Sequence, residues 1–184
     1  YDVVVVGGGT AGCAAAYTAG KLGLKTLIIE KNIHLGGTIT SGLVIPVMRS
    51  GKNQINTEFR ETLITELHEL GGQTTYQDNP AWFNPELAKI ALDNLMRKAN
   101  VEVFFDTHII GIKQEGREIK RIKISKEILS VSTDEIDMDK KKLSVSIGAR
   151  HVIDATGNCE IGKICNCRFL EKQKEFQPVT LRFM

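Results

Sequence analysis

The feature that most constrains this chain is a glycine-rich turn that directly follows a short apolar run. Val3 to Val6 are β-branched residues in succession, which is typical of a central parallel strand covered on both faces. Residues 7–12 read Gly-Gly-Gly-Thr-Ala-Gly and satisfy the pattern Gly-x-Gly-x-x-Gly. The alanine-rich stretch from Cys13 to Gly23 predicts a helix, and Lys25 to Glu30 predicts a second strand. Together these pieces predict a parallel βαβ unit of about thirty residues.

The residues of this turn suit the binding of a dinucleotide. Gly7 permits the tight turn, Gly9 lets the backbone approach a pyrophosphate, and Gly12 lets the helix pack closely against the strand. Thr10 and Ala11 lie in front of the helix N-terminus, whose free N–H groups and partial positive charge favour an anion. A plain structural turn is the alternative interpretation of the pattern.

Glu30, at the end of the second strand, supports the dinucleotide interpretation. An acid about twenty residues after the turn can accept hydrogen bonds from both hydroxyls of an adenosine ribose. Its carboxylate repels a 2′-phosphate, so NADP is disfavoured. NAD and FAD both fit this first motif.

Composition excludes several classes of function. At 184 residues, 42% of them apolar, the chain is long enough for one domain with a core. A net charge of +2 offers no strong field to nucleic acid or acidic lipid, and the apolar run at 3–6 is far too short to cross a membrane. Four cysteines without a secretory leader favour a reducing compartment, so the expected location is cytoplasmic.

The rest of the chain alternates between helical and strand-like patterns. Helices are predicted over 57–70 and from the cap Asn84 to about Ala99. Strands are predicted over 101–105, 108–113, 119–124, 143–147 and 150–154, with a solvated, charged hairpin extension over 125–142. The alternating apolar run at 179–184 suggests the start of a partner domain that lies outside this sequence.

Six stretches spread over nearly the whole chain match one known pattern. They are Asp2 to Gly12, Glu30-Lys31, Leu35 to Thr38, Ser41 to Val44, Val152 to Asn158 and Gln177 to Thr180. In these stretches the chain resembles the FAD-dependent oxidoreductases with two FAD-binding motifs, a broad group that includes glutathione reductase, and in particular a bacterial subgroup. The resemblance implies an α/β, Rossmann-like FAD/NAD(P)-binding fold over 1–178. A mostly helical insertion would occupy 39–100 and a β-meander 101–148, with a truncated substrate domain starting at 179–184.

The resemblance also implies which residues contact FAD. The strand that ends at Ala155, Thr156 and Gly157 would return beside the first glycine turn and bring its backbone to the cofactor. Asn158 replaces the acid that is usual after this motif and is a weaker candidate. Further candidates are Lys31 after the ribose acid; the backbone of Ile109 at adenine; Gly36, Gly37 and Thr38 near the ribityl chain or pyrophosphate; and Ser41 near the isoalloxazine ring.

The chain lacks the thiol pair of the dithiol reductases in this group. Where those enzymes carry Cys-x4-Cys, this sequence has Ile39 and Val44, so disulfide reductase chemistry is excluded. Cys159, Cys165 and Cys167 match no common metal spacing, and packing on a helix is expected for them.

The sequence therefore predicts the FAD-binding part of a flavin-dependent oxidoreductase with an unidentified small-molecule substrate. No acid or base is assigned, since the histidines form no triad-like pattern, and Arg49 and Arg60 are expected to be solvated. Two alternatives stay open: an NAD-dependent dehydrogenase, and a nucleotide-binding module that senses or scaffolds without catalysis.

Overall fold

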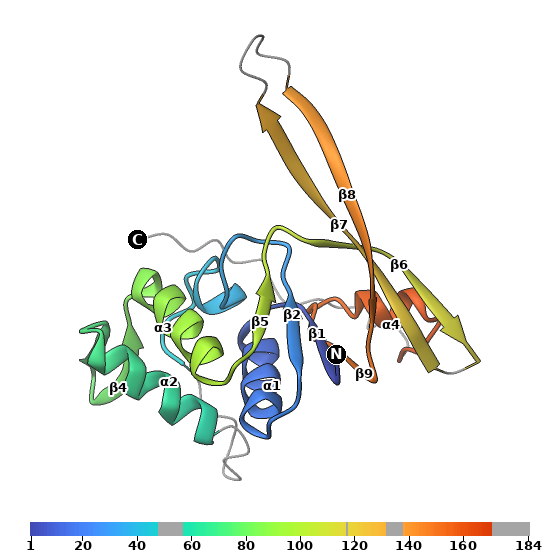
Figure 1. Ribbon diagram of the computed structural model, residues 1–184. Helices are drawn as coiled ribbons and strands as arrows, with labels where there is room; N and C mark the ends of the chain where they lie inside the picture. The colour runs from blue at the N-terminus through green and yellow to red at the C-terminus, as the bar shows by residue number, and fades with distance from the viewer. Residues whose placement is uncertain (48–56, 117, 132–137, 171–184) are drawn as a thin grey trace.

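A parallel sheet forms the centre of the molecule, with helices on one face and an antiparallel meander on the other (Figure 1). The computed structural model describes residues 1–47, 57–116, 118–131 and 138–170. The α/β fold class with a parallel central sheet and a β-meander is confirmed.

The sheet has the strand order β5-β2-β1-β9. Its strands are β1 (Val3–Val6), β2 (Thr26–Ile29), β5 (Glu102–Phe104) and β9 (His151–Asp154), all parallel. Val6 lies opposite Ile29 on one side and Asp154 on the other. The carboxyl ends of these strands therefore meet at one edge, where ligands of open α/β sheets bind.

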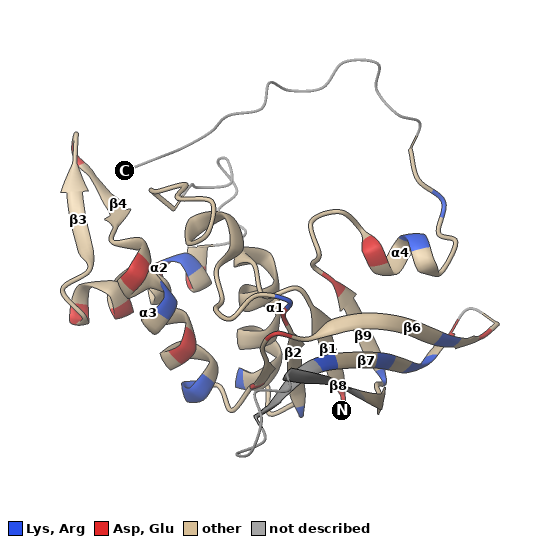
Figure 2. Ribbon diagram, turned by 90° about the horizontal axis from the view of Figure 1, so that it is seen from above, with Lys and Arg blue, Asp and Glu red and all other residues tan. Residues whose placement is uncertain are grey.

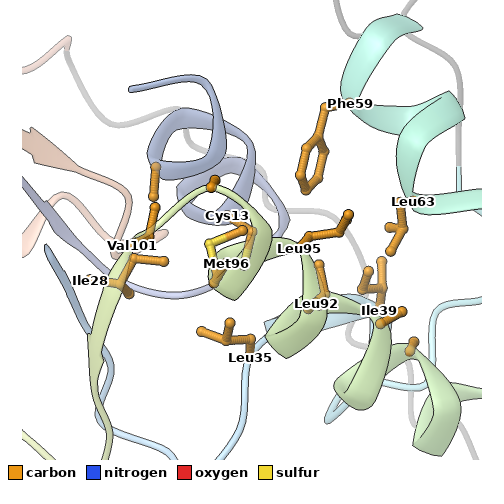
Figure 3. Close-up of a cluster of buried hydrophobic side chains, with 14 of the residues drawn as sticks. Cys13, Ile28, Leu35, Ile39, Phe59, Leu63, Leu92, Leu95, Met96 and Val101 are labelled. Carbon is orange, nitrogen blue, oxygen red and sulfur yellow. The ribbon is translucent and has the colours of Figure 1, made fainter. Parts of the chain in front are cut away.

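Each face of the sheet packs into its own core. On one face, Val3, Val5 and Ile28 pack against helices α1 (Thr10–Lys21), α2 (Thr57–Glu69) and α3 (Pro85–Lys98), as Figure 3 shows around Cys13 and Met96. On the other face, Val4, Val6, Leu27 and Ile29 pack against Ile122, Ile124 and Ile147 of the meander. The continuous apolar runs of β1 and β2 follow from this burial on both sides.

Helix α1 begins at Thr10, three residues before the predicted start at Cys13. The prediction took all of residues 7–12 as turn. In the structure Gly9 is the N-cap, with φ −67° and ψ −179°, and the last residues of the glycine pattern are already helical.

The segment between β2 and β5 contains more than helices. It runs from a 3₁₀ turn η1 (Gly37–Ile39) through α2 and a hairpin of β3 (Gln73–Tyr76) and β4 (Asn79–Phe83) to α3. The hairpin was not predicted. Both helices were, and Asn84 caps α3 as expected, its Oδ1 accepting from the N–H groups of Glu86 at 2.8 Å and Leu87 at 3.3 Å.

The meander consists of β6 (His108–Glu115), β7 (Glu118–Val131) and β8 (Met138–Gly148). The strand predicted over 101–105 is not part of it, because β5 pairs in parallel with β2. The far end of the β7–β8 hairpin projects away from the parallel sheet (Figure 1). Charges of both signs are distributed over α2, α3 and the described parts of β6 and β7 (Figure 2).

Candidate functional site

A cavity of about 380 Å³ lies at the carboxyl ends of β1, β2 and β9. Its walls come from the glycine turn with the start of α1, the loops after β2, β5 and β9, and the first residues of β6 and α4 (Glu160–Ile164). The lining residues are Val6, Gly7, Gly9, Thr10, Ala11, Ile29, Glu30, Lys31, Asn32, Gly37, Thr38, Thr107, His108, Ile109, Ala155, Thr156, Gly157 and Glu160.

Most of the predicted site residues therefore surround one space, although they come from distant parts of the chain. The structure places Gly12, Gly36, Ser41 and Asn158 outside this lining. Gly12 and Gly36 are buried behind it, and Ser41 and Asn158 are exposed. Whether each residue binds the cofactor remains a prediction.

Close backbone packing explains two glycines of the turn. A Cβ on Gly12 would lie 1.9 Å from the carbonyl oxygen of Gly7, so no larger residue fits there. Gly7 has φ +99°, and a Cβ on it would lie 2.4 Å from the oxygen of Ala155. The turn thus packs tightly against the start of α1 and against the end of β9.

Gly9 differs, because nothing in the described part of the protein requires it to be glycine. An added Cβ would meet no atom of the described residues within 4 Å, and the backbone conformation is open to any residue. The bare Cα borders the cavity, beside Thr10 and Ala11 at the N-terminus of α1. The first N–H groups of a helix have no partner within it, so this wall offers donors and partial positive charge to an anion that approaches the backbone closely. These residues fit the pyrophosphate of a dinucleotide.

Glu30 is buried at the edge of the cavity, with 5% of its surface exposed. Its Oε2 accepts from the N–H of Gly8 at 2.6 Å. Its Oε1 accepts from both the backbone N–H and the side-chain Nδ2 of Asn32, each at 2.8 Å. The carboxylate is thereby held in one orientation beside the glycine turn. Asn32 was missed in the sequence, and its signal is its place two residues after Glu30, the predicted ribose acid.

Asp154 fixes the second motif and was also missed. Its Oδ1 accepts from the N–H of Thr156 at 3.1 Å and from the Thr156 hydroxyl at 2.7 Å, and its Oδ2 accepts from the N–H of Gly162 at 3.0 Å. Burial raises the pKa of this carboxyl, but these hydrogen bonds outweigh burial and hold the pKa below its ordinary value. The turn through Gly157, where φ is +79°, is therefore anchored to the end of β9.

The loop after β5 and the start of β6 together supply three neighbouring lining residues, of which only Ile109 was predicted. The N–H of Thr107 donates to the carbonyl of Glu30 at 3.0 Å and ties this loop to the end of β2. His108 follows at the start of β6. Glu160, the first residue of α4, donates its N–H to the Thr156 hydroxyl at 2.9 Å. No sequence pattern distinguishes these residues, because their role depends on which loops meet.

The cysteines offer no chemistry to this site. Cys13 is buried, its Sγ donates to the carbonyl of Gly8 at 3.2 Å, and burial raises its pKa to about 12, so the thiol stays protonated. Packing on a helix does not describe the other cysteines, since Cys159 and Cys167 are exposed and only Cys165 is half-buried. Within the described ranges, no group of His, Cys, Asp and Glu side chains is arranged to hold a metal ion.

Two further expectations are tested by the structure. Arg60 was expected in solvent, and this is wrong, because the residue is buried on α2 with 7% of its surface exposed. Arg49 lies outside the described residues. Among the helices that the structure describes, none has the length and apolar character needed to span a membrane. The reducing compartment remains a prediction.

The fold and the cavity are those of a nucleotide-binding α/β domain, and comparison with known families makes this specific. The model of the FAD dependent oxidoreductase family matches residues 2–183, so the chain belongs to that family. The sequence resemblance is confirmed, and FAD is the cofactor that this membership assigns. The family match therefore favours FAD over NAD as the cofactor, and a flavin-dependent oxidoreductase over an NAD-dependent dehydrogenase.

Characterised relatives are similar at low identity. A thiamine thiazole synthase of Sulfolobus acidocaldarius is 29% identical over 160 residues, which cover 85% of this chain and 55% of that protein. A digeranylgeranylglycerophospholipid reductase of Thermoplasma acidophilum is 28% identical over 150 residues, which cover 71% of this chain and 37% of that protein. The chain thus spans only 37–55% of the lengths of these two relatives.

Solved structures support the fold alone. A flavoprotein/dehydrogenase from Cytophaga hutchinsonii matches with a TM-score of 0.59 and 21% identity, covering 96% of this chain and 44% of that one. THI4 of Thermovibrio ammonificans matches with a TM-score of 0.55 and 23% identity, covering 84% of this chain and 57% of that one.

Proposed function

We propose that this chain is the FAD-binding part of an oxidoreductase and that FAD lies extended in the cavity at the carboxyl ends of β1, β2 and β9. FAD supplies the hydride or electron transfer when it is bound, and the protein binds and orients it. The domain would comprise residues 1–178, and the predicted start of a substrate domain at 179–184 lies outside the residues that the structure describes. The partner in the reaction would be a small molecule.

Each part of the cofactor would contact a different set of lining residues. The N-terminus of α1, with Gly9, Thr10 and Ala11, would take the pyrophosphate, and Glu30 with Lys31 the adenosine ribose. The backbone of Ile109 would face adenine, while Gly37 and Thr38 would pass near the ribityl chain. Ala155, Thr156 and Gly157 would close the opposite wall. The candidates outside the lining have lesser roles: Gly12 and Gly36 shape the turn, Ser41 would lie near the isoalloxazine ring, and Asn158 would reach a cofactor hydroxyl.

One observation carries the proposal: residues from four distant stretches converge on one cavity that combines a helix N-terminus with a buried carboxylate. The first suits a diphosphate, and the second suits a ribose with free hydroxyls. The chemistry would proceed without a thiol pair, since Ile39 and Val44 stand where dithiol reductases carry cysteines.

FAD titration of the full chain tests the binding step. We expect saturable quenching of flavin fluorescence with one FAD per chain. Glu30→Gln keeps the shape and an acceptor for Gly8 but removes the charge, and should weaken FAD binding about tenfold, as for a charge-assisted hydrogen bond. Lys21→Gln, an exposed change at the far end of α1, is the control. A chain that binds NAD and not FAD would overturn the proposal.

The relatives suggest where to look for a substrate. Their names describe a thiamine thiazole synthase and a phospholipid reductase, so small molecules of both kinds are the first candidates to try. For the whole protein, reduction of bound flavin by a small-molecule donor, followed by its reoxidation, would support the enzyme. Flavin that no donor reduces, together with a partner whose affinity changes with FAD, would support the non-catalytic alternative.

A further inference from the structure

The Glu30 carboxylate has too few free hydrogen-bond acceptor positions to bind both hydroxyls of a ribose. A carboxylate can accept about four hydrogen bonds. Among the described residues, the N–H of Gly8 and two donors of Asn32 already occupy three of these positions. Only one position is left, on Oε2, whereas an adenosine ribose brings two hydroxyl groups.

Asn32 supplies what Glu30 lacks. Because a carboxylate only accepts, the Asn32 amide must turn its NH₂ group towards Glu30. This leaves Oδ1 as the amide atom that can accept from a hydroxyl. Asn32 lines the same cavity as Glu30, and its own carbonyl accepts from the N–H of Asp106 at 3.1 Å, so the backbone that carries the amide is anchored.

We propose that Asn32 is a second ribose-recognition residue, and that Glu30 and Asn32 each accept one of the two ribose hydroxyls of the bound cofactor. This inference rests on the proposed function. The bond from Nδ2 to Oε1 orients both acceptors together, so the pair recognises a ribose with two free hydroxyls. Glu30 alone would distinguish only one of them.

Adenosine diphosphates that lack one ribose hydroxyl test whether Glu30 and Asn32 each accept from one hydroxyl. The full chain would be loaded with FAD, and ADP, 2′-deoxy-ADP and 3′-deoxy-ADP would each compete for the site, with flavin fluorescence as the readout. For the wild type, we expect both deoxy nucleotides to compete about three- to tenfold more weakly than ADP, as for the loss of one hydrogen bond.

Asn32→Ala gives the decisive pattern. It should weaken ADP binding about three- to tenfold. The variant should no longer distinguish ADP from one of the two deoxy nucleotides, and it should still bind the other one more weakly than ADP. The variant retains the backbone N–H bond of residue 32 to Glu30, and thermal unfolding verifies its fold. Ile33→Ala, in the same loop and 78% exposed, is the matched control and should bind all three nucleotides like the wild type.

Three other results would overturn the inference. If Asn32→Ala weakens all three nucleotides by one factor, Asn32 only holds Glu30 in place. If it strengthens ADP binding, the Asn32 amide competes with the ribose for Glu30. If it changes no affinity, Asn32 takes no part in recognition. In each case the wild type still binds FAD, so the proposed function survives. A wild type that binds neither FAD nor ADP would overturn the proposed function itself.

Discussion

At Gly9 and Gly12 the same added methyl group meets opposite surroundings. On Gly12 it would lie 1.9 Å from the carbonyl oxygen of Gly7, so Gly12→Ala must displace α1 from the turn. We expect it to lower the free energy of unfolding by at least about 1–3 kcal/mol, the usual range for overpacking. Urea unfolding measures this.

Gly9→Ala is the counterpart, since its methyl group would enter the cavity and meet no atom within 4 Å among the residues that the structure describes. The free energy of unfolding should stay within about 1 kcal/mol of the wild type. FAD affinity should fall about tenfold or more, because the backbone can no longer approach the pyrophosphate. Unchanged FAD binding would show that the cofactor does not approach this turn.

The Asp154 carboxyl predicts how stability depends on pH. Although burial opposes ionisation, hydrogen bonds from Thr156 and Gly162 lower its pKa in the folded state. Such a group stabilises the fold above its unfolded pKa of about 3.9, and this contribution is lost as the pH falls through the folded pKa. Asp154→Asn should be less stable than the wild type at pH 7, and the difference should shrink at about pH 3. Thermal unfolding at both pH values measures it, and a constant difference would contradict the prediction.

Among the elements, helix α3 depends on its cap. Asn84 Oδ1 accepts from two N–H groups of the first turn, so Asn84→Ala should lower the free energy of unfolding by about 1 kcal/mol. Asn84→Asp keeps an acceptor oxygen and should stay near the wild type. Equal losses in the two variants, measured by urea unfolding, would show that the cap contributes little.

Local signals predicted the elements that carry them. Asn84 followed by Pro85 gave the start of α3, and the apolar run before Gly7 gave β1. The β3–β4 hairpin was missed for two reasons. Pro80 lies within β4, where proline is unusual, and the turn between the two strands has positive φ at Gln77 and Asp78, where glycine is the usual residue. The place of β5 beside β2 depends on pairing across more than seventy residues of sequence, as Leu27 with Glu102 shows, and no local pattern encodes it.

In the whole molecule, parallel pairing assembles the site. Because β1, β2 and β9 run in the same direction, the glycine turn, Glu30 and the Ala155 turn reach the same edge of the sheet. The sequence predicted this convergence through its motifs and family resemblance. Thr107 could not be predicted in the same way, since its place depends on the contact of its loop with the end of β2. Asn32 and Glu160 bond to residues close in sequence, Glu30 and Thr156, but neither belongs to a motif that the sequence displays.

The same arrangement separates the site from the far end of the β7–β8 hairpin. The meander contributes His108 and Ile109 to the cavity from the start of β6, and Ile122, Ile124 and Ile147 to the core beneath the sheet. The distal hairpin projects away from both (Figure 1). Replacing residues 127–142 by an Asn-Gly turn between Lys126 and Leu143, which pair across the two strands, should therefore leave the domain intact.

FAD affinity should change by no more than about twofold in this shortened chain, as for a surface change away from the site. Ile122→Ala provides the contrast, because its fully buried side chain fills the core between meander and sheet, and its loss should lower the free energy of unfolding by about 2–5 kcal/mol. FAD titration and urea unfolding of both variants measure the difference. If the shortened chain lost FAD while Ile122→Ala kept it, the hairpin and not the base of the meander would support the cofactor site.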